Sequence, residues 1–514
     1  MNTTHAAMRT LSLLLALCLL LPTFAACSGG TENPGEKQNE TEPQAADPTA
    51  AEESGTETPP DEEALGIHVE SGLEKVDMGG RQFVFLSTNW YYDGYGWDEI
   101  YAEEYTGEPI NDGIYDRNLY MEKNFNTSVE IITSPDVYAA AQTFSQSVLA
   151  GDHAYDIFMT YLNQYQSLAM QGLLYDLAQI PHVNYDRTYW DRNAYDALSI
   201  ANLHFVVNSD ITIRDKTATS KILFNKPLYA DLSLEDPYEM VREGRWTLDK
   251  LREFMLLVSN DSNGDGVMDT KDTYGLVGIR DCLTSFLNGS NHHLAEKNEE
   301  DVPVFDPGDE PMVTSIMRIM EMMYDDDHFL NGHKYKENDG GGVITGIFQE
   351  NRALFLADSS AFVFGLREMD VDFGILPIPK ESEAQENYFS EVSPWVGACM
   401  ALPVNTRDED LDWTGIFLEE YACQGRNYII PAFYEKLLKG KTTRDADSVE
   451  MLDIIYGSRA YDIGSIGNWN DLCWGVLYLT MTNNDRITST LKAKERGVKK
   501  TIDKLLDTIA DQYS

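Results

Sequence analysis

The chain has 514 residues, of which 43% are hydrophobic and 24% are charged, and its formal net charge is −46. That length exceeds what one hydrophobic core usually holds, so the sequence predicts two lobes or domains. The excess of Asp and Glu argues against nucleic acid or an anionic membrane as a partner, because both surfaces repel negative charge.

The first 27 residues have the features of an export signal. Arg9 precedes an apolar run, Leu11–Leu21, which is too short to span a bilayer but matches the apolar part of a signal peptide. Small residues then precede Cys27, as in the lipobox of bacterial lipoproteins, in which the cysteine is acylated. Two or three acyl chains would hold the mature chain stably at the membrane. Cleavage by an ordinary signal peptidase, without acylation, is the alternative.

Residues 28–65 are predicted to form a disordered acidic tether. Between Ser28 and Ala64, no apolar side chain apart from proline is larger than Ala, and acidic residues far outnumber the single Lys37. Such a segment cannot bury enough apolar surface to fold. As a flexible coil, a chain of this length would reach roughly 30 to 40 Å.

The folded body is predicted to begin near Gly80 and to alternate strands with helices. A β-rich run (RQFVFLSTNW) follows Gly80, and further strands are predicted at Ser128–Ile132, Tyr155–Met159, His204–Val207, Ile222–Asn225, Tyr274–Gly278, Ala361–Phe364 and Phe373–Pro377. Helices are predicted at 111–125, 137–152, Thr247–Ser259 and Val313–Tyr324, and the C-terminal region is predicted to be mostly helical. This order favours an α/β fold with a largely parallel sheet.

The segment Asp261–Asp272 (DSNGDGVMDTKD) has the ligand spacing of a calcium loop. Oxygen donors stand at its first, third, fifth, ninth and twelfth positions, the seventh supplies a backbone carbonyl, and glycine at the sixth permits the sharp turn. The predicted ligands are Asp261, Asn263, Asp265, the Val267 carbonyl, Asp269 and Asp272. The twelfth position usually carries Glu, so the shorter Asp resembles dockerin-type loops. A metal-free turn rich in Asx and Gly residues is the alternative.

The residues on either side of this loop predict a structural calcium site and not a calcium sensor. Thr247 is the predicted N-cap of a helix whose apolar face includes Leu248 and Leu251. The loop is followed by Thr273–Gly278, which is rich in Gly and β-forming residues. A sensor moves an exit helix, and none is predicted here. Calcium would therefore join a helix to a strand.

Four cysteines belong to the folded body, and no two of them form a C-x-x-C pair. They are Cys282, Cys399, Cys423 and Cys473. Their wide spacing does not support a zinc or redox motif. Export permits disulfides, but buried free thiols are the favoured interpretation.

Several segments, in the order in which they occur, resemble one protein family. They are GRWTLDKLREFM, SNDSNGDGVMDTKDTYGL, FQENRALFLAD, DFGILPIPK and SPWVGACMALPV, followed by AFYEKLLKGKTTRDADSVEMLDIIYGSRAYDIG. With the lipobox and the acidic tether, they resemble the family 1 extracellular solute-binding proteins of bacterial ABC importers, the broad group that includes maltose-binding protein. The resemblance covers the body from about residue 80 to 514. Each motif alone is weak evidence for the family, but the order in which the motifs occur is quite specific.

The resemblance implies a type II, two-lobed periplasmic-binding-protein-like α/β fold, in which hinged lobes close on a ligand in the cleft between them. By that analogy, lobe 1 would hold residues 78–207 and 393–435, and lobe 2 would hold residues 208–392 and 436–514. The segment NSDITIRDKTATSKILFNK would be one crossing between the lobes. The stretch from DFGILPIPK to SPWVG would be another.

The candidate ligand contacts rest on chemistry and on the resemblance together. Sugars present apolar ring faces and hydroxyl edges, so their sites combine aromatic rings with Asp, Asn or Glu. The candidates are Trp90 and Tyr92 after the first strand, Tyr161 and Asn163 after the strand predicted at Tyr155–Met159, Asp210 in the first crossing, Trp395 after the return crossing, and Trp469 and Trp474, which are similar in place to a late aromatic of sugar-binding members. A single Trp is more often core than ligand contact, but two or more of the group are expected to line the cleft.

The leading hypothesis is a lipid-anchored extracellular solute-binding protein that captures a carbohydrate, with an oligosaccharide as the expected ligand, and delivers it to the permease of an ABC importer. A monomer without catalytic activity is the family expectation, with structural calcium as the one cofactor and no nucleic-acid partner. A secreted glycan-active enzyme is one alternative, although the sequence contains neither G-x-S-x-G nor H-E-x-x-H. The same fold binding a peptide or another small solute is the other.

Overall fold

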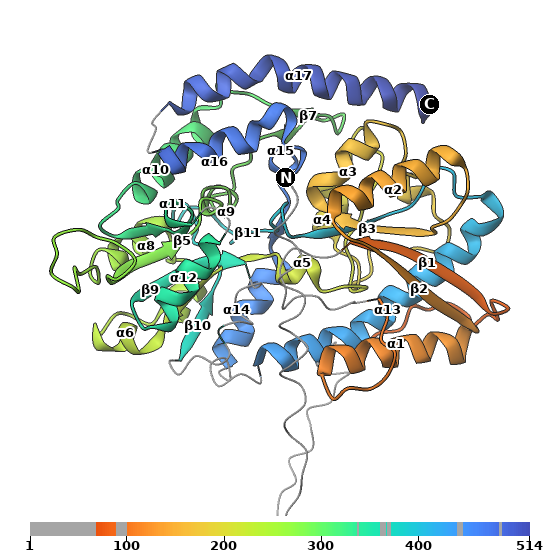
Figure 1. The fold of residues 1–514 in the computed structure, drawn as a ribbon, viewed down its shortest axis with the longest axis horizontal. Coiled ribbons are helices and arrows are strands. Elements are labelled where there is room, and N and C mark those ends of the chain that lie inside the picture. The colour runs from red at the N-terminus through yellow and green to blue at the C-terminus, as the bar shows by residue number, and fades with distance from the viewer. Residues whose placement is uncertain are drawn as a thin grey trace, which may run out of the picture. The chain divides into compact units, whose positions relative to one another are not determined.

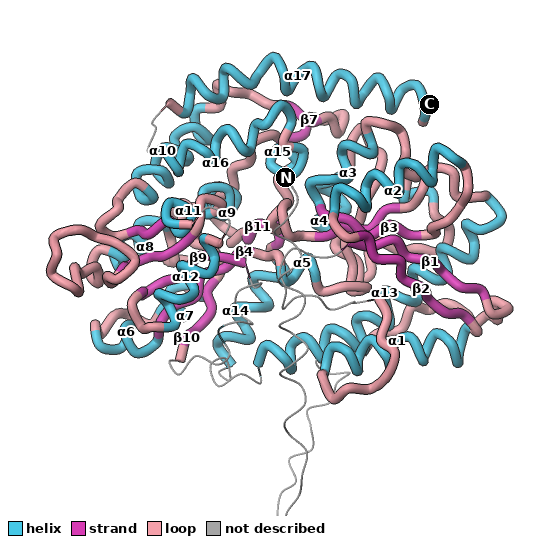
Figure 2. The backbone as a smooth tube through the Cα atoms, in the orientation of Figure 1, coloured by secondary structure: helices cyan, strands magenta, loops and turns pink. Residues whose placement is uncertain are grey.

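The computed structural model of the protein describes residues 68–88, 100–336, 339–359, 366, 372–438, 446–482 and 486–513. All of them belong to one structural unit, residues 59–514. Within this unit the longer strands form two separate sheets with helices packed around each (Figure 1, Figure 2). Several predicted features lie outside the described residues: the export signal with Cys27, the acidic tether of residues 28–65, the pair Trp90 and Tyr92, and the strand at Ala361–Phe364.

The first sheet has four strands in the order β12-β3-β1-β2. Strand β1 pairs in parallel with β2 and β3, whereas β12 runs antiparallel to β3. The strands are β1 (Arg81–Thr88), β2 (Thr127–Ser134), β3 (Ile157–Tyr161) and β12 (Ala398–Ala401). The accompanying helices are α1 (Pro109–Phe125), α2 (Val137–Ala150), α3 (Leu162–Ala169), η1 (Leu177–Gln179), α4 (Arg192–Leu198) and α13 (Asp408–Leu438).

Alternating side chains of β1 bury both faces of the first sheet. Phe83 stacks on Phe417 of α13, with ring centroids 3.9 Å apart, and Phe85 packs beside the same ring. Leu86 belongs to a different hydrophobic cluster, which includes Phe144 of α2. Successive side chains of a strand point to opposite faces, so β1 lies between two layers of helices.

Local capping directs the chain from α2 into β3. The Asp136 side chain accepts the Ala139 N–H (2.8 Å) at the start of α2. Gly151 ends the helix in the left-handed region, at φ 66°, and its N–H bonds to the Ser147 carbonyl (3.0 Å). This turn returns the chain toward the first sheet, where β3 begins.

The second sheet has five strands in the order β10-β4-β9-β5-β8 and is mixed. Strand β5 is parallel to β8 and β9, whereas β4 is antiparallel to β9 and β10. The strands are β4 (Ser220–Asn225), β5 (Tyr274–Gly278), β8 (Phe329–Asn331), β9 (Ala353–Ser359) and β10 (Phe373–Leu376). The other elements of this part are α6 (Lys226–Asp231), α7 (Pro237–Arg242), α8 (Leu248–Met255), α9 (Cys282–Gly289), the hairpin β6 (Glu296–Lys297) and β7 (Pro303–Val304), α10 (Glu310–Met323), α11 (Gly332–Tyr335), α12 (Gly340–Gln349) and α14 (Ala446–Gly457).

The segments that connect the two sheets lie next to one another. The first contains α5 (Arg214–Thr217), and its Thr219 pairs with Val392 of the second. In the second, β11 (Ser390–Glu391) pairs in parallel with β13 (Arg459–Ala460). This third extended segment was not predicted as part of the connection.

After β13 the chain forms α15 (Ile463–Gly467), η3 (Trp469–Asp471), α16 (Leu472–Thr482) and the long helix α17 (Ile487–Gln512), which is drawn at the top of Figure 1. Helix α17 packs against α16 and α10. Farther along α17, the Thr508 hydroxyl donates to the Met170 carbonyl (3.2 Å), just after α3. The helix therefore contacts elements around both sheets.

Most of the predicted elements are confirmed, but two features differ. The strand predicted at His204–Val207 is wrong, because the His204 carbonyl accepts the Leu177 N–H (2.7 Å) and only Val207 makes an isolated bridge, to Met400. The largely parallel order holds for the first sheet but not for the second, which includes the unpredicted central strand β9. Within the described ranges, no helix combines the length and apolarity that crossing a bilayer requires.

Candidate functional site

The carboxyl end of β3 meets the loop that precedes β12. Tyr161 is the last residue of β3 and is only 2% exposed. In the first turn of α3, the Asn163 N–H donates to the Pro394 carbonyl (3.2 Å), which satisfies one of the donors left open at a helix start. This bond holds the loop with Trp395 against α3. The structure thus places Tyr161, Asn163 and Trp395, three of the candidate ligand contacts, near one another.

Trp395 contacts a second predicted aromatic, Trp474, which in turn contacts a cation that was not predicted. The rings of Trp395 and Trp474, on α16, have centroids 4.7 Å apart and an interplanar angle of 44°. The Arg280 guanidinium lies 4.5 Å from the centroid of the Trp474 ring, a cation–π contact. Arg280 lies two residues after the end of β5. We call Trp395, Trp474 and Arg280 the aromatic cluster; it joins the carboxyl ends of strands from both sheets.

Two buried donors at these strand ends have no hydrogen-bond partner within the described ranges. They are Nε1 of the half-buried Trp395 and Nδ2 of Asn331, which ends β8 and is 1% exposed. Buried polar groups are nearly always paired, and an indole N–H can only donate. A ligand oxygen that reached these donors would complete their hydrogen bonding.

The second sheet adds charged groups that the sequence reasoning missed. Arg280 Nε lies 3.8 Å from Asp281 Oδ2, and the same oxygen lies 4.0 Å from Nδ1 of His333, which follows β8. Burial raises the pKa of Asp281, although Arg280 and His333 oppose the shift. Ligands of α/β proteins bind outside the carboxyl ends of strands. That rule, applied to the predicted strand at Tyr274–Gly278, would have found Arg280 and Asp281.

The remaining predicted contacts, Trp469 and Asp210, are about as buried as Tyr161. Trp469 is 2% exposed and belongs to the hydrophobic core around α16. Asp210 is 3% exposed and lies among buried charges. Of the predicted aromatics in the described part of the chain, Trp395 and Trp474 are the half-buried pair, so they offer the surface that a ligand can reach.

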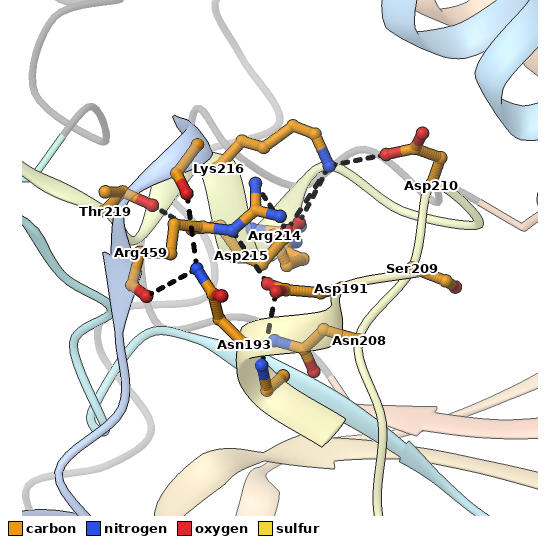
Figure 3. A network of polar contacts seen from close by, with 12 residues as sticks. Asp191, Asn193, Asn208, Ser209, Asp210, Arg214, Asp215, Lys216, Thr219 and Arg459 are labelled. Carbon is orange, nitrogen blue, oxygen red and sulfur yellow. Dashed lines mark hydrogen bonds and ion pairs between the residues drawn. The ribbon is translucent and has the colours of Figure 1, made fainter. Parts of the chain in front are cut away.

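Asp210 belongs to a buried charge network that joins the connecting segments (Figure 3). Lys216 Nζ lies 2.7 Å from Asp210 Oδ1 and 3.3 Å from Asp215 Oδ2. Arg459, in β13, bridges Asp191 (2.7 Å) and Asp215 (3.3 Å). None of these five side chains is more than 12% exposed. Buried charges persist only when they are paired, so the network fixes how these segments meet.

Glu391 of β11 is a buried carboxyl group held by helix α9. Its Oε2 accepts the hydroxyls of Ser285 (2.9 Å) and Thr284 (3.1 Å), and its side chain is 3% exposed. Burial raises the pKa of Glu391 to about 8, although these hydroxyls oppose the shift. Glu391 is therefore protonated in the folded protein at neutral pH.

Glu391 should make the protein less stable as the pH rises. The folded state keeps the Glu391 proton up to about pH 8, whereas an unfolded chain loses it near the ordinary pKa of 4.5. Between these values the free energy of unfolding should fall by up to about 1.4 kcal/mol per pH unit. The Glu391→Gln variant should lack this term. Urea unfolding of both proteins at about pH 5 and about pH 8 measures this term. If the free energy of unfolding fell by the same amount between the two pH values in both proteins, the prediction would be wrong.

The predicted calcium loop joins a helix to a strand, as expected. Thr247 caps α8 by accepting the Lys250 N–H (3.3 Å), and β5 follows the loop at Tyr274. The loop is closed at its base by paired backbone bonds between Asn260 and Thr273 (3.0 and 3.1 Å). No exit helix is present in this described segment, so the loop has no element for a sensor to move.

The side chains of the loop fold back on its own backbone. Asp261 accepts the Gly264 and Gly266 N–H groups (2.7 and 2.8 Å), and both glycines have positive φ. Asp272, 0% exposed, accepts the Ser262 and Asp269 N–H groups (both 2.9 Å). In the described chain no three His, Cys, Asp or Glu side chains gather as a metal cluster. The groups of the loop that could bind a metal nevertheless all present oxygen atoms, which are the ligands that hard cations such as calcium prefer.

The four cysteines of the body, Cys282, Cys399, Cys423 and Cys473, are buried free thiols, as favoured from sequence. Burial raises the pKa of each thiol above its usual value. They are therefore unreactive core residues.

Comparison with known proteins identifies the fold but not the family. No family model matches the chain, and no curated protein matches it in sequence. The chain is structurally similar to a sugar transporter of Rhizobium etli in an open conformation (16% identity, TM-score 0.55, covering 81% of this chain and 99% of that one). It is also similar to UspC of M. tuberculosis (14%, 0.53, 82% and 100%) and to a cyclo/maltodextrin-binding protein complexed with maltotetraose (11%, 0.51, 84% and 99%). The protein therefore has the predicted two-lobed, periplasmic-binding-protein-like α/β fold.

Proposed function

We propose that the protein is an extracellular solute-binding protein that captures a carbohydrate, an oligosaccharide in the first instance, and delivers it to the permease of an ABC importer. The observation that carries this proposal is the half-buried ring of Trp395, whose buried N–H lacks a partner in the described residues and which packs on Trp474. It lies where strands of both sheets end. Two structural neighbours, a sugar transporter and a cyclo/maltodextrin-binding protein, support a sugar as the ligand.

The chemistry of the site suits a sugar ring. An aromatic face packs on the apolar C–H face of the ring, while a few placed polar groups bind its hydroxyls. The Trp395 N–H and the Asn331 amide supply donors, and Asp281 supplies an acceptor. Binding would favour the state in which both sheets contact the ligand, so differential affinity for closed and open states drives closure. No bond of the ligand needs to break.

Sugar capture is tested by thermal-shift measurements against neutral oligosaccharides, monosaccharides and short peptides. A ligand that binds only the folded state at 100 times its Kd adds about 2.7 kcal/mol of stability. At least one oligosaccharide should raise the melting temperature and be recovered chemically unaltered. Stabilisation by peptides alone would contradict the carbohydrate assignment, and the appearance of shortened glycans would assign the protein to the enzyme class instead.

Location at the outer face of the membrane is the second part of the proposal. Its support is the sequence around Cys27, whose acyl chains would hold the body through the acidic tether. Metabolic labelling with a palmitate analogue should label the parent chain and not the Cys27→Ala variant. Labelling of both proteins, or of neither, would contradict lipid anchoring. We also propose that the protein is a monomer when it holds its ligand.

Calcium is proposed as a structural ion of the loop Asp261–Asp272, held by Asp261, Asn263, Asp265, the Val267 carbonyl, Asp269 and Asp272. When bound, it would stabilise the junction of α8 with β5. Calcium at tenfold its Kd should add about 1.4 kcal/mol to the free energy of unfolding, and a chelator should remove that increment. The Asp265→Ala variant should lose the response, whereas Asp327→Ala, an exposed Asp outside the loop, should keep it. A calcium response that survives Asp265→Ala would contradict the assignment.

A further inference from the structure

A cavity of about 650 Å³ lies beside the segments that connect the two sheets. Small-molecule sites usually have volumes of roughly 300 to 1,000 Å³. Its walls are formed by the helices α4, α7 and α14 and by the segment that leads into β11. The lining includes the side chains of Asn193, Arg242, Glu386, Phe389, Glu450 and Ile454. We call this space the connection cavity.

The connection cavity is separate from the aromatic cluster. Phe389 and Ser458, which line the cavity, precede the strands β11 and β13, and these strands pair in parallel, so their amino ends lie together. Trp395 instead follows the carboxyl end of β11. None of the three residues of the aromatic cluster lines the cavity. A ligand of the cavity would therefore not occupy the proposed sugar site.

Helices associated with both sheets share the walls of the cavity. Helices α7 and α14 pack against β10 of the second sheet (Figure 2). Helix α4 follows the strands of the first sheet, and its Asn193 Nδ2 donates to the carbonyls of Gly457 (3.3 Å) and Arg459 (3.0 Å), which lie before and in β13 (Figure 3). A molecule in the cavity would therefore contact both halves of the protein.

The one cation in the lining is already paired with several carboxylates. Each nitrogen of Arg242 donates to a carboxylate: Nε to Glu450 (3.0 Å), Nη1 to Glu239 (2.6 Å), and Nη2 to Glu450 (2.6 Å) and Asp447. Glu386 adds a further carboxylate, which no ion pair or side-chain hydrogen bond engages among the described residues. The cavity and the residues that hold Arg242 thus carry four carboxylates for one guanidinium.

The other cations around the cavity do not reverse this balance. Arg192, Arg245 and Arg459 are each paired with two carboxylates. Lys380 is 2% exposed, donates to a backbone carbonyl (2.7 Å) and lies 5.2 Å from the ring centroid of Tyr388. Its charge offsets one of the four carboxylates, so negative charge stays in excess. An anionic ligand would be repelled here.

The cavity also offers apolar surface. Phe389 and Ile454 are half-buried and line it together with the buried Val241. An aromatic ring attracts a cation as well as an apolar group. The lining therefore combines carboxylate acceptors with a compact apolar surface, which matches a ligand that carries a positive charge on an apolar body.

We propose that the connection cavity binds a small organic amine. The ammonium group lies toward Glu386 and Glu450, and the apolar body packs on Phe389 and Ile454. An ammonium group has three N–H donors and no acceptor, which suits a lining whose charged groups in excess are acceptors. A neutral polyol could form the hydrogen bonds but would gain nothing from the negative charge. The amine is a second ligand, distinct from the sugar proposed for the aromatic cluster.

The test is protection of a thiol placed in the cavity lining. The chain that begins at Ser28 keeps the whole structural unit of residues 59–514, and the cysteines of the body are buried. Iodoacetamide should therefore alkylate the exposed thiol of the Asn387→Cys variant first. Benzylamine at tenfold its Kd, found by titrating this rate, should slow alkylation roughly tenfold, because it leaves about one-tenth of the sites free. Benzyl alcohol and benzoate, in which a hydroxyl or a carboxylate replaces the ammonium, should protect far less.

Matched variants locate the amine. Glu386→Gln should weaken protection roughly two- to fivefold, the effect of one partly exposed ion pair. Glu383→Gln changes the net charge equally, at an exposed position of the same segment outside the lining, and should change nothing. A thiol at that position, in Glu383→Cys, should be alkylated at the same rate with and without benzylamine.

The Trp395→Ala variant separates this site from sugar capture, and benzylamine should protect Asn387→Cys equally well in that background. Failure of the protein to bind sugar would leave this result unaffected. Absence of protection by benzylamine, equal protection by benzyl alcohol, equal losses in Glu386→Gln and Glu383→Gln, or loss of protection with Trp395→Ala would each overturn the proposal. The last result would place the amine at the aromatic cluster.

Discussion

Replacing Trp395 with Ala should weaken sugar binding by about 2 kcal/mol or more, which is roughly 30-fold. The substitution removes the aromatic face, the indole N–H that has no partner among the described residues, and the contact with Trp474. It should not unfold the protein, since Trp395 is half-buried and makes no side-chain hydrogen bond in the described chain. Isothermal titration with the oligosaccharide found in the thermal-shift screen measures the change in affinity.

Two further variants show which property of Trp395 matters. The Trp395→Phe variant keeps a ring but loses the N–H, so its affinity should lie between those of the parent and Trp395→Ala. Trp413 is a half-buried Trp on α13, which packs against β1 on the first sheet, and Trp413→Ala should leave affinity unchanged. If Trp413→Ala and Trp395→Ala weakened binding equally, the loss would reflect general damage and the aromatic cluster would not be the site.

Much of the fold follows from local sequence, because its signals act over short distances. Thr247 before α8 was predicted as a cap, and the structure shows it accepting the Lys250 N–H; Asp136, which was not predicted, caps α2 in the same way. Strand β5 was predicted with its observed bounds, Tyr274–Gly278. Strand β9 was missed because its apolar run, Ala353–Ala357, is buried throughout and carries no alternation to distinguish a strand from a helix.

The site was harder to predict than the fold, since it is assembled from distant parts of the chain. Trp395 and Trp474 were chosen from sequence, but nothing in the sequence shows that their rings lie 4.7 Å apart or that Arg280 completes the cluster. His333 was missed because it follows the three-residue strand β8, which is too short to show a period. The division of the chain between the two lobes stays a prediction.

Asp210 illustrates why residue type alone does not identify a ligand contact. It was selected as a polar residue in a crossing segment. A carboxylate there can bind a sugar hydroxyl or pair with a buried cation, and the residue type does not distinguish the two. The structure places its carboxylate 2.7 Å from Lys216, inside a network with Asp191, Asp215 and Arg459. A buried carboxylate beside a buried amine is first of all a structural pair. The charges that hold the connection between the sheets are thus distinct from the aromatic cluster.

The Arg459→Met variant should be destabilised by about 3 to 5 kcal/mol, because it leaves buried carboxylates without their cation. Although burial by itself raises the pKa of Asp191, Arg459 and the Tyr461 hydroxyl outweigh it and hold that pKa below its usual value. Without Arg459, Asp191 must stay charged and unpaired or take up a proton. Urea unfolding at neutral pH measures the loss. The half-buried Arg245, which pairs with the exposed Glu235 and Glu243, is the control, and Arg245→Met should leave the unfolding midpoint nearly unchanged.

A second substitution decides whether the loss comes from the uncompensated charge. Adding Asp191→Asn to Arg459→Met removes the orphaned carboxylate while keeping a side chain that can accept the Tyr461 hydroxyl, whose distance to Asp191 is 2.6 Å. The double variant should therefore be more stable than Arg459→Met alone, and a double-mutant cycle gives the coupling energy of the pair. If the two substitutions simply added, Arg459 would act through packing, and the connection between the sheets would not depend on these buried charges.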